Sequence, residues 1–155
     1  MAKLTNQHWH LGDVFLVPLA DGSSVVGQVV AQEKGVLNSV SCAFFDRRVK
    51  STAEIPASLD KVFSVLFVTR DSLDEQKWLI AGNRPVTLPR TLLPYEKFRE
   101  AGFVGAKVIG SANVVKFLNA FFALAPWDVM KDPDYFDRFL LAPDQKPKKL
   151  IYRQL

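Results

Sequence analysis

The sequence predicts an α+β domain with an antiparallel, strongly twisted or barrel-like sheet of about six strands and two C-terminal helices packed on it. Short apolar runs separated by turn residues fill residues 11–90, and apolar residues at helical spacing fill residues 111–142. A final strand is expected at residues 148–155. The chain has 155 residues, of which 48% are hydrophobic, so residues 1–155 suit a single domain with its own core.

The first two strands are expected at Asp13–Leu19 and Ser24–Gln32, joined as a hairpin. The turn between them, Ala20–Ser23, contains an aspartate that can bond its own backbone and a glycine that permits positive φ. Pro18 cannot donate to a ladder, so the first strand should lie at an edge or stop there. Gly27, inside the second strand, predicts a bulge or a close approach of the backbone to a neighbour.

Three further strands are expected before the helical part. Val36–Asp46 alternates apolar with small residues, which predicts one buried face and places Cys42 in the core. Lys61–Thr69 is apolar on both faces, which favours a central strand, and Lys77–Ala81 begins the next strand. A turn-rich connector follows, marked by three prolines: Pro85, Pro89 and Pro94.

Two helices are expected in the second half. Asn113–Ala125 carries apolar residues at i, i+3, i+4, i+7 and i+8, with Ser111 or Asn113 as the cap. A second helix should begin at Asp132, a preferred cap residue followed by proline, and end at Pro143. The chain closes with a strand at Lys149–Leu155.

The net charge of +4 is concentrated at one end of the chain. Four of the 20 basic residues lie in the last eleven residues, which hold no Asp or Glu, and the remaining 144 residues carry 16 groups of each sign. The body of the protein is therefore neutral, which argues against a broad surface for nucleic acid. A second, smaller basic patch consists of three residues: Arg47, Arg48 and Lys50.

An acidic stretch opposes these positive charges. Between Asp128 and Asp144, five aspartates outnumber Lys131 and Arg138. Complementary charge orients partners during their encounter, and aromatic residues anchor many interfaces. We therefore predict an acidic partner-binding surface made of Trp127, Asp128, Asp132, Asp134, Tyr135 and Asp137. The competing surface, which an acidic partner would favour, is the basic patch of Arg47, Arg48 and Lys50.

The sequence contains no recognisable catalytic or metal-binding pattern. His8 and His10 form an HxH pair, but a stable metal site needs three or four ligands. A nucleophilic serine or cysteine needs a base and an orienting group, and both histidines lie within ten residues of the start. We therefore expect no metal, no cofactor and no enzymatic activity. Cys42 cannot form an internal disulfide, and with no signal segment or membrane span this indicates the cytoplasm.

The first hairpin resembles the opening of the bacterial toxin-immunity family catalogued as immunity protein 26. The shared features are a Gly-Asp pair entering a strand (Gly12-Asp13), an Asp-Gly turn (Asp21-Gly22) and a glycine in the second strand. A later Trp-x-x-x-Gly element resembles Trp78 to Gly82, so the resemblance covers roughly residues 11–90. We expect these motif residues to act structurally, through unusual backbone angles, bonds to nearby amides and packing.

The resemblance implies a cytoplasmic bacterial protein that binds and neutralises a cognate toxin by stoichiometric interaction. Two other functions remain open at the level of sequence. One is a nucleic-acid-binding, small barrel-like module that uses Arg47, Arg48, Lys50 and the basic end. The other is an enzyme or small-ligand domain, which should show a deep polar pocket.

Overall fold

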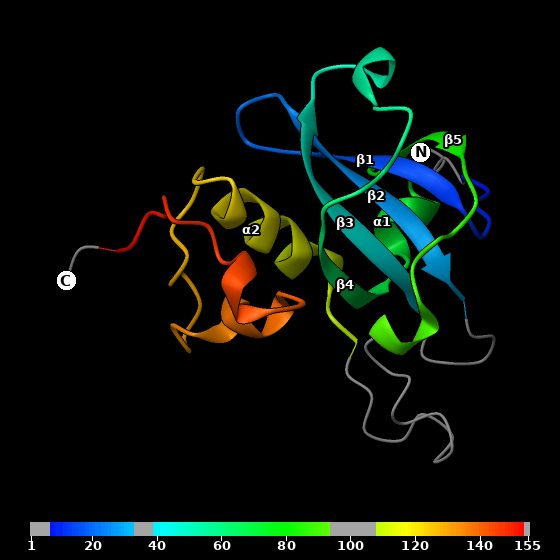
Figure 1. Cartoon of the computed structure of the whole chain (residues 1–155). Coiled ribbons are helices and arrows are strands. Elements are labelled where there is room, and N and C mark those ends of the chain that lie inside the picture. The colour runs from blue at the N-terminus through cyan, green and yellow to red at the C-terminus, as the bar shows by residue number, and fades with distance from the viewer. Residues whose placement is uncertain (1–6, 33–38, 94–107, 154–155) are drawn as a thin grey trace, which may run out of the picture.

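Five antiparallel strands and two α-helices make up the part of the chain that the computed structural model describes, residues 7–32, 39–93 and 108–153. The strands are β1 (Asp13–Pro18), β2 (Ser24–Ala31), β3 (Ser39–Val49), β4 (Val62–Thr69) and β5 (Leu79–Asn83). The helices are α1 (Asp71–Asp74), α2 (Ser111–Phe121) and the short 3₁₀ helices η1 (Thr52–Glu54), η2 (Arg90–Leu92), η4 (Tyr135–Phe139) and η5 (Pro143–Gln145). Figure 1 shows α2 and the C-terminal segment together on one side of the sheet. The prediction of an α+β domain is confirmed.

The sheet is an open meander with one returning strand. β1 to β4 are antiparallel neighbours in chain order, and β5 returns to pair with β1, which gives the order β4-β3-β2-β1-β5. Within the described residues β4 and β5 are the two edges and do not pair, so the predictions of a barrel-like sheet and of six strands are wrong. Residues 36–38 of the predicted strand Val36–Asp46 lie outside the described residues, and the observed strand runs on to Val49.

The final strand predicted at Lys149–Leu155 is replaced by a single bridge. Ile151 pairs in parallel with Pro126, and the N–H of Trp127 donates to the carbonyl of Ile151 at 2.7 Å. Pro126 has no N–H, so it cannot add a ladder bond that would lengthen the pairing. Residues 154 and 155 of the predicted strand lie outside the described residues.

The second C-terminal helix, predicted from Asp132 to Pro143, is only the five-residue 3₁₀ helix η4. Asp132 accepts the N–H of Asp134 at 3.0 Å and so forms a turn before the helix rather than its cap. Side chains three positions apart eclipse in 3₁₀ geometry, and Phe136 and Phe139 are both buried. The five residues of η4 are therefore enough to bury this pair, and a longer helix is not required. One of the two predicted C-terminal helices is thus absent from the described residues.

The helix α2 confirms the predicted amphipathic stripe but begins and ends earlier than Asn113–Ala125. Ala123 adopts φ 59°, a left-handed conformation in which helices commonly end, so the helix stops at Phe121. Its N-cap residue is Gly110, which has no side chain to donate or accept, so neither predicted residue caps it from that position.

Residues at the end of β4 bind the N-terminus of α2 instead. The Thr69 hydroxyl accepts the N–H of Ser111 at 3.0 Å and donates to Asp71 at 2.6 Å, and the Ser111 hydroxyl donates to the other Asp71 oxygen at 2.9 Å. A carboxylate at this end of a helix is favoured by the helix dipole. Burial alone would raise the pKa of Asp71, but the hydroxyl hydrogen bonds from Thr69 and Ser111 lower it below its usual range.

We expect Asp71→Asn to lower the free energy of unfolding at neutral pH by about 1 kcal/mol, a value reduced for solvent exposure. Because the folded-state pKa is lowered, the stabilisation is present above the unfolded-state pKa and is lost as pH falls through the folded-state pKa. The difference between the two proteins should therefore shrink in acid. Urea unfolding at a series of pH values measures it, and a difference that does not change with pH would contradict the assignment.

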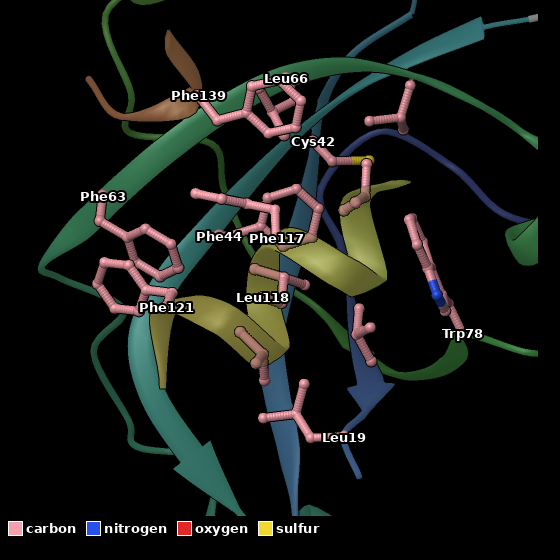
Figure 2. Packing of buried hydrophobic residues seen from close by; sticks show 14 of the residues in the cluster. Leu19, Cys42, Phe44, Phe63, Leu66, Trp78, Phe117, Leu118, Phe121 and Phe139 are labelled. Atoms are coloured by element: carbon pink, nitrogen blue, oxygen red, sulfur yellow. The ribbon is translucent and has the colours of Figure 1, made fainter. Parts of the chain in front are cut away.

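Both faces of the sheet are buried over most of β2, β3 and β4. On the first face, Val40, Cys42 and Phe44 pack in one cluster with α2 and Trp78 (Figure 2). Ala43 and its neighbours on the second face belong to another cluster, which is covered by residues of the 55–59 and 86–93 connections. The prediction that this strand has one buried face is therefore wrong. Burial raises the pKa of the Cys42 thiol, and the residue behaves as the core hydrophobe that the sequence predicts.

The strand β4 is buried on both faces, yet it is an edge strand rather than the predicted central one. Ile109 occupies part of its outer edge, accepting the N–H of Thr69 at 3.0 Å and donating to Phe67 at 2.7 Å. Leu141 donates its N–H to the carbonyl of Phe63 at 3.0 Å further along. Loop segments therefore satisfy backbone groups that a sixth strand would otherwise pair. No helix in the described part is long and apolar enough to cross a bilayer.

Gly27 allows an aromatic ring to lie directly against the backbone of β2, as predicted. Gly27 is the register partner of Phe15, and a Cβ placed on it would lie 2.6 Å from the Phe15 ring. Trp78 stacks on the same ring, with centroids 5.4 Å apart and planes 2° from parallel. Pro18 ends β1 beyond the pairing with β5, which reaches Leu16.

Candidate functional site

The predicted acidic surface is built around a buried tryptophan. Trp127 is 1% exposed and contacts Phe117 and Phe136, so its ring lies in the core. Its indole N–H donates to Asp137 at 2.7 Å. Asp137 also pairs with Lys146 at 3.0 Å, and the hydrogen bond to this carboxylate raises the pKa of Lys146. Trp127 and Asp137 therefore hold the C-terminal segment to the core.

Two further aspartates of this surface, Asp128 and Asp132, also have partners. Asp128 accepts the backbone N–H of Arg153 at 2.8 Å and lies 3.8 Å from its guanidinium. Asp132 pairs with Arg138 at 2.7 Å, and its pKa is lowered, first by the Asp134 N–H and then by Arg138. Two basic residues near the end of the chain, Lys146 and Arg153, thus pair with aspartates of the acidic stretch, and Arg138 pairs with Asp132 within that stretch.

Two residues of the predicted surface remain available to a partner. Asp134 is exposed and makes no ion pair with any described residue. Tyr135 is half-buried, and its ring packs edge-on against Phe139 with centroids 5.0 Å apart. The partner-binding role of the whole surface remains a prediction, and its accessible charge is reduced mainly to Asp134.

We expect Asp134→Lys to slow association with a basic partner several-fold at low salt, and less at high salt. Stopped-flow measurement of association with the protein domain encoded by the adjacent upstream gene gives the rate. The free energy of unfolding should change by less than about 0.5 kcal/mol, because no described residue pairs with this side chain. Lys131→Ala, an exposed change nearby, serves as the control, and an unchanged association rate for Asp134→Lys would exclude this surface.

One residue of the predicted basic patch, Arg48, forms side-chain contacts within the chain. Arg48 pairs with Asp21 at 3.3 Å and lies over the Phe122 ring at 4.9 Å, so it joins the β1–β2 turn to the end of α2. Hydrogen bonds from Ser23, and then the charge of Arg48, lower the pKa of Asp21. Arg47 and Lys50 are exposed and remain available to a partner.

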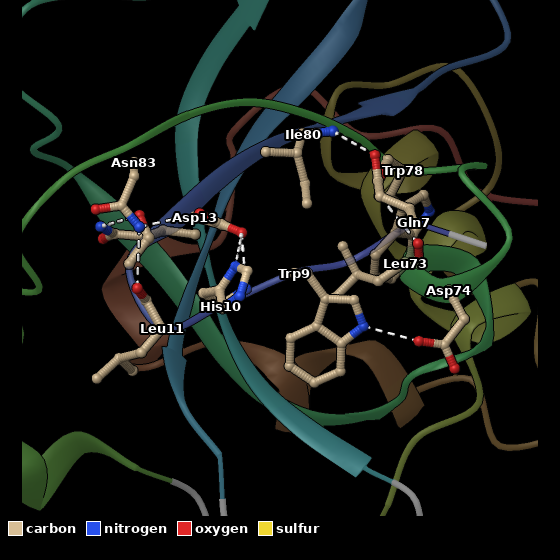
Figure 3. Close-up of polar contacts among 12 residues, drawn as sticks. Gln7, Trp9, His10, Leu11, Asp13, Leu73, Asp74, Trp78, Ile80 and Asn83 are labelled. Atoms are coloured by element: carbon tan, nitrogen blue, oxygen red, sulfur yellow. Dashed lines mark hydrogen bonds and ion pairs between the residues drawn. The ribbon is translucent and has the colours of Figure 1, made fainter.

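The segment before β1 binds the edge strand β5, as Figure 3 shows. The Gln7 side chain donates to the carbonyl of Trp78 at 2.9 Å and accepts the N–H of Ile80 at 3.1 Å. The Trp9 indole donates to Asp74 at 2.8 Å, and Arg70 pairs with the other oxygen of that carboxylate at 2.8 Å. The described segment that holds the two histidines is thus fixed in place by hydrogen bonds to Trp78, Ile80 and Asp74.

His8 and His10 lie at the surface in the segment before β1. Both side chains are exposed, and His10 lies 3.8 Å from the carboxylate of Asp13. No group of three or more potential metal ligands occurs among the described residues.

The family-motif residues come together around β1. Gly12 has φ 89°, and a Cβ there would lie 2.6 Å from the carbonyl oxygen of Arg84. Asp13 is buried and accepts the backbone N–H of His10 and the side-chain amide of Asn83. These bonds fix the entry of the chain into β1 against the end of β5.

The remaining motif residues are also structural. Gly22 has φ 87° in the β1–β2 turn, where Asp21 accepts the N–H of Ser23 at 3.0 Å. Trp78 is buried on the Phe15 ring, and Gly82 pairs with Val14.

A cavity lined by both polar and apolar residues, which sequence reasoning missed, lies beside β2. It has a volume of about 220 Å³ and is lined by Gln28, Ala57, Ser58, Leu59, Arg84, Pro85 and Thr87. Gln28 is only 4% exposed, although it lies between Val26 and Val30 on an apolar face of the sheet. A glutamine that interrupts a run of valines was the available signal, because buried polar residues are uncommon and need partners.

Fold and sites together describe a small α+β domain whose polar residues mostly hold its segments together. No family model, no curated protein and no solved structure matches this chain. The resemblance carried by Gly12 to Gly22 and Trp78 to Gly82 therefore remains a hypothesis.

Proposed function

We propose that this chain is a cytoplasmic bacterial immunity protein that binds a cognate toxin stoichiometrically and blocks it without catalysis. The observation that carries the proposal is the placement of the two motif segments. They are 56 residues apart from Gly22 to Trp78 in sequence, yet β1 and β5 are paired, and Phe15 stacks on Trp78. This adjacency supports the view that the two segments belong to one structural unit rather than to unrelated turns.

The nucleic-acid alternative has less support. Its candidate residue Arg48 is paired with Asp21 and Phe122, and in the basic end Lys146 and Arg153 pair with aspartates. A surface that binds phosphates needs several accessible cations that release counterions on binding.

Co-expression with the C-terminal domain encoded by the adjacent upstream gene tests the proposal. That domain should arrest growth of a bacterial host when expressed alone, and this chain should restore growth in the same host. The purified mixture should elute as a complex of fixed stoichiometry in size-exclusion chromatography. The variant Lys116→Ala, exposed on α2, is the control that should still restore growth. A toxic upstream domain that this chain neither binds nor neutralises would contradict the proposal.

A further inference from the structure

Arg84 is a half-buried cation whose charge is not balanced by a carboxylate in the described part of the chain. One guanidinium nitrogen donates to the carbonyl of Pro56. No described residue forms an ion pair with Arg84. A guanidinium has five N–H donors in a planar fork, so most of its hydrogen-bonding capacity is available beside the cavity.

Beside the hydrogen-bond donors of Arg84, the side chain of Gln28 supplies a hydrogen-bond acceptor. Its side-chain nitrogen donates to the carbonyls of Gly12 at 3.2 Å and of Arg84 at 2.9 Å. Two carbonyl acceptors fix the orientation of the amide, because only the nitrogen can donate to both. No described residue donates to its side-chain oxygen. The group that this buried residue leaves for a ligand is therefore a hydrogen-bond acceptor.

The size of the cavity and its charge restrict the ligand. A volume of about 220 Å³ is smaller than the roughly 300–1,000 Å³ of sites that hold drug-sized molecules, so a group of a few heavy atoms fits. Arg84 is the single cation among the described residues of the lining, and one positive charge suits a monoanion better than a phosphate dianion. The planar fork matches a carboxylate with two parallel hydrogen bonds.

We propose that Arg84 and Gln28 form a binding site for an N-acyl amino acid group. The carboxylate pairs with the guanidinium of Arg84, and the adjacent amide N–H donates to the side-chain oxygen of Gln28. Such a group occurs in a small N-acylated acid and at the C-terminal end of a peptide. The site is independent of the proposed immunity function, since it requires no toxin.

The test is a titration of the ¹⁵N-labelled full chain with N-acetylglycine, followed by ¹H–¹⁵N correlation spectra. Saturable shifts are expected at the N–H of Gly12 and Arg84 and at the side-chain amide of Gln28. N-acetylglycinamide lacks the charge, and acetate lacks the N–H. Each should bind at least about tenfold more weakly than N-acetylglycine. Equal binding of the amide would overturn the role of Arg84, and equal binding of acetate would overturn that of Gln28.

Variants separate this cavity from general charge effects. Arg84→Met should weaken binding of N-acetylglycine about tenfold, whereas Arg47→Met, which removes the same charge at an exposed position, should leave it unchanged within about twofold. Equal loss in both variants would overturn the site. If Arg84→Met fails to fold, the comparison of the three probes on the unaltered chain still tests whether Arg84 and Gln28 bind the ligand.

A peptide probe separates the two sources of the ligand. Acetyl-Ala-Ala-Gly, which ends in the same group, should bind at least as tightly as N-acetylglycine if the site takes a chain end. Binding about tenfold weaker would assign the site to a small free acid. No saturable shift at Gly12, Gln28 and Arg84 with either probe would overturn the proposal.

Discussion

Replacing Phe117 by alanine is expected to lower the free energy of unfolding by about 3–5 kcal/mol, the largest loss for any single substitution proposed for this chain. Phe117 is fully buried in the middle of α2. Its ring lies 5.0 Å from that of Phe139, 5.6 Å from Phe136 and 5.8 Å from Trp127. Removing it leaves a cavity where the helix, the sheet and the C-terminal segment meet.

The loss should be read out by chemical denaturation, with the midpoint and the slope followed together. Total stabilities of domains are about 5–15 kcal/mol, so the variant should be marginally folded at best. Lys116→Ala, at the neighbouring exposed position of α2, should change the free energy of unfolding by less than about 0.5 kcal/mol. A loss below about 1 kcal/mol for Phe117→Ala would mean that the C-terminal segment does not pack on α2 as described.

Replacing Gly27 by valine is expected to lower the free energy of unfolding by about 3 kcal/mol, at the upper end for overpacked cores. A Cβ at this position would lie 2.6 Å from the Phe15 ring and 3.3 Å from the carbonyl oxygen of Ala43. Phe15 is fully buried and is stacked on Trp78. The ring therefore cannot move aside without disturbing the tryptophan, and the strain must be taken up by the backbone of β1 and β2.

Thermal unfolding followed by tryptophan fluorescence suits this variant, because Trp78 reports on the same stack. Gly82→Ala is the matched control: Gly82 also lies in a strand, but a Cβ there would meet no atom within 4 Å. We expect Gly82→Ala to change the free energy of unfolding by less than about 0.5 kcal/mol. Equal effects of the two substitutions would show that the ring of Phe15 does not lie over Gly27.

The predictions for Phe117→Ala and Gly27→Val both depend on contacts between aromatic rings. Twelve phenylalanines and three tryptophans occur in 155 residues, and the described rings form a continuous set of contacts from β4 to the C-terminal segment. Phe63 stacks on Phe121 with centroids 3.7 Å apart, and its ring also contacts Phe117 (Figure 2). Phe117 in turn contacts Trp127, with ring centroids 5.8 Å apart. Each large ring buries much apolar area. Removing one ring therefore removes contacts from several neighbouring rings and lowers the stability of the fold.

The candidate sites show where sequence reasoning succeeded and where it could not. The motif residues Gly12, Asp13 and Trp78 act structurally, as predicted from their residue types, because positive φ, an acceptor beside a turn and a large ring are local requirements. The acidic surface was predicted from a run of aspartates. The partners of Asp137 and Asp128 are Lys146 and Arg153 in the basic end of the sequence. A charge count along the chain does not show that these two stretches contact each other.

The cavity of Arg84 and Gln28 was missed for a related reason. Gln28 interrupts the valines of β2, which is visible in the sequence. The sequence does not show that its side-chain amide donates hydrogen bonds to the carbonyls of Gly12 and Arg84. These three residues are far apart in the chain and meet because β5 returns to pair with β1. Such a site depends on strand order, which local patterns leave undetermined.

The sequence by itself determined the class of the domain, the positions of the five observed strands within a few residues and the apolar stripe of α2. Each of these depends on periodicity and turn chemistry along one segment. Tertiary structure alone decided that β4 is an edge, that Ile151 forms a bridge rather than a strand, and that η4 is a short 3₁₀ helix. In each case the deciding contact comes from a distant segment: Ile109 on β4, Pro126 on Ile151, and the Phe117 ring on Phe136. The burial and hydrogen bonding gained there outweigh the weak local preferences of short segments.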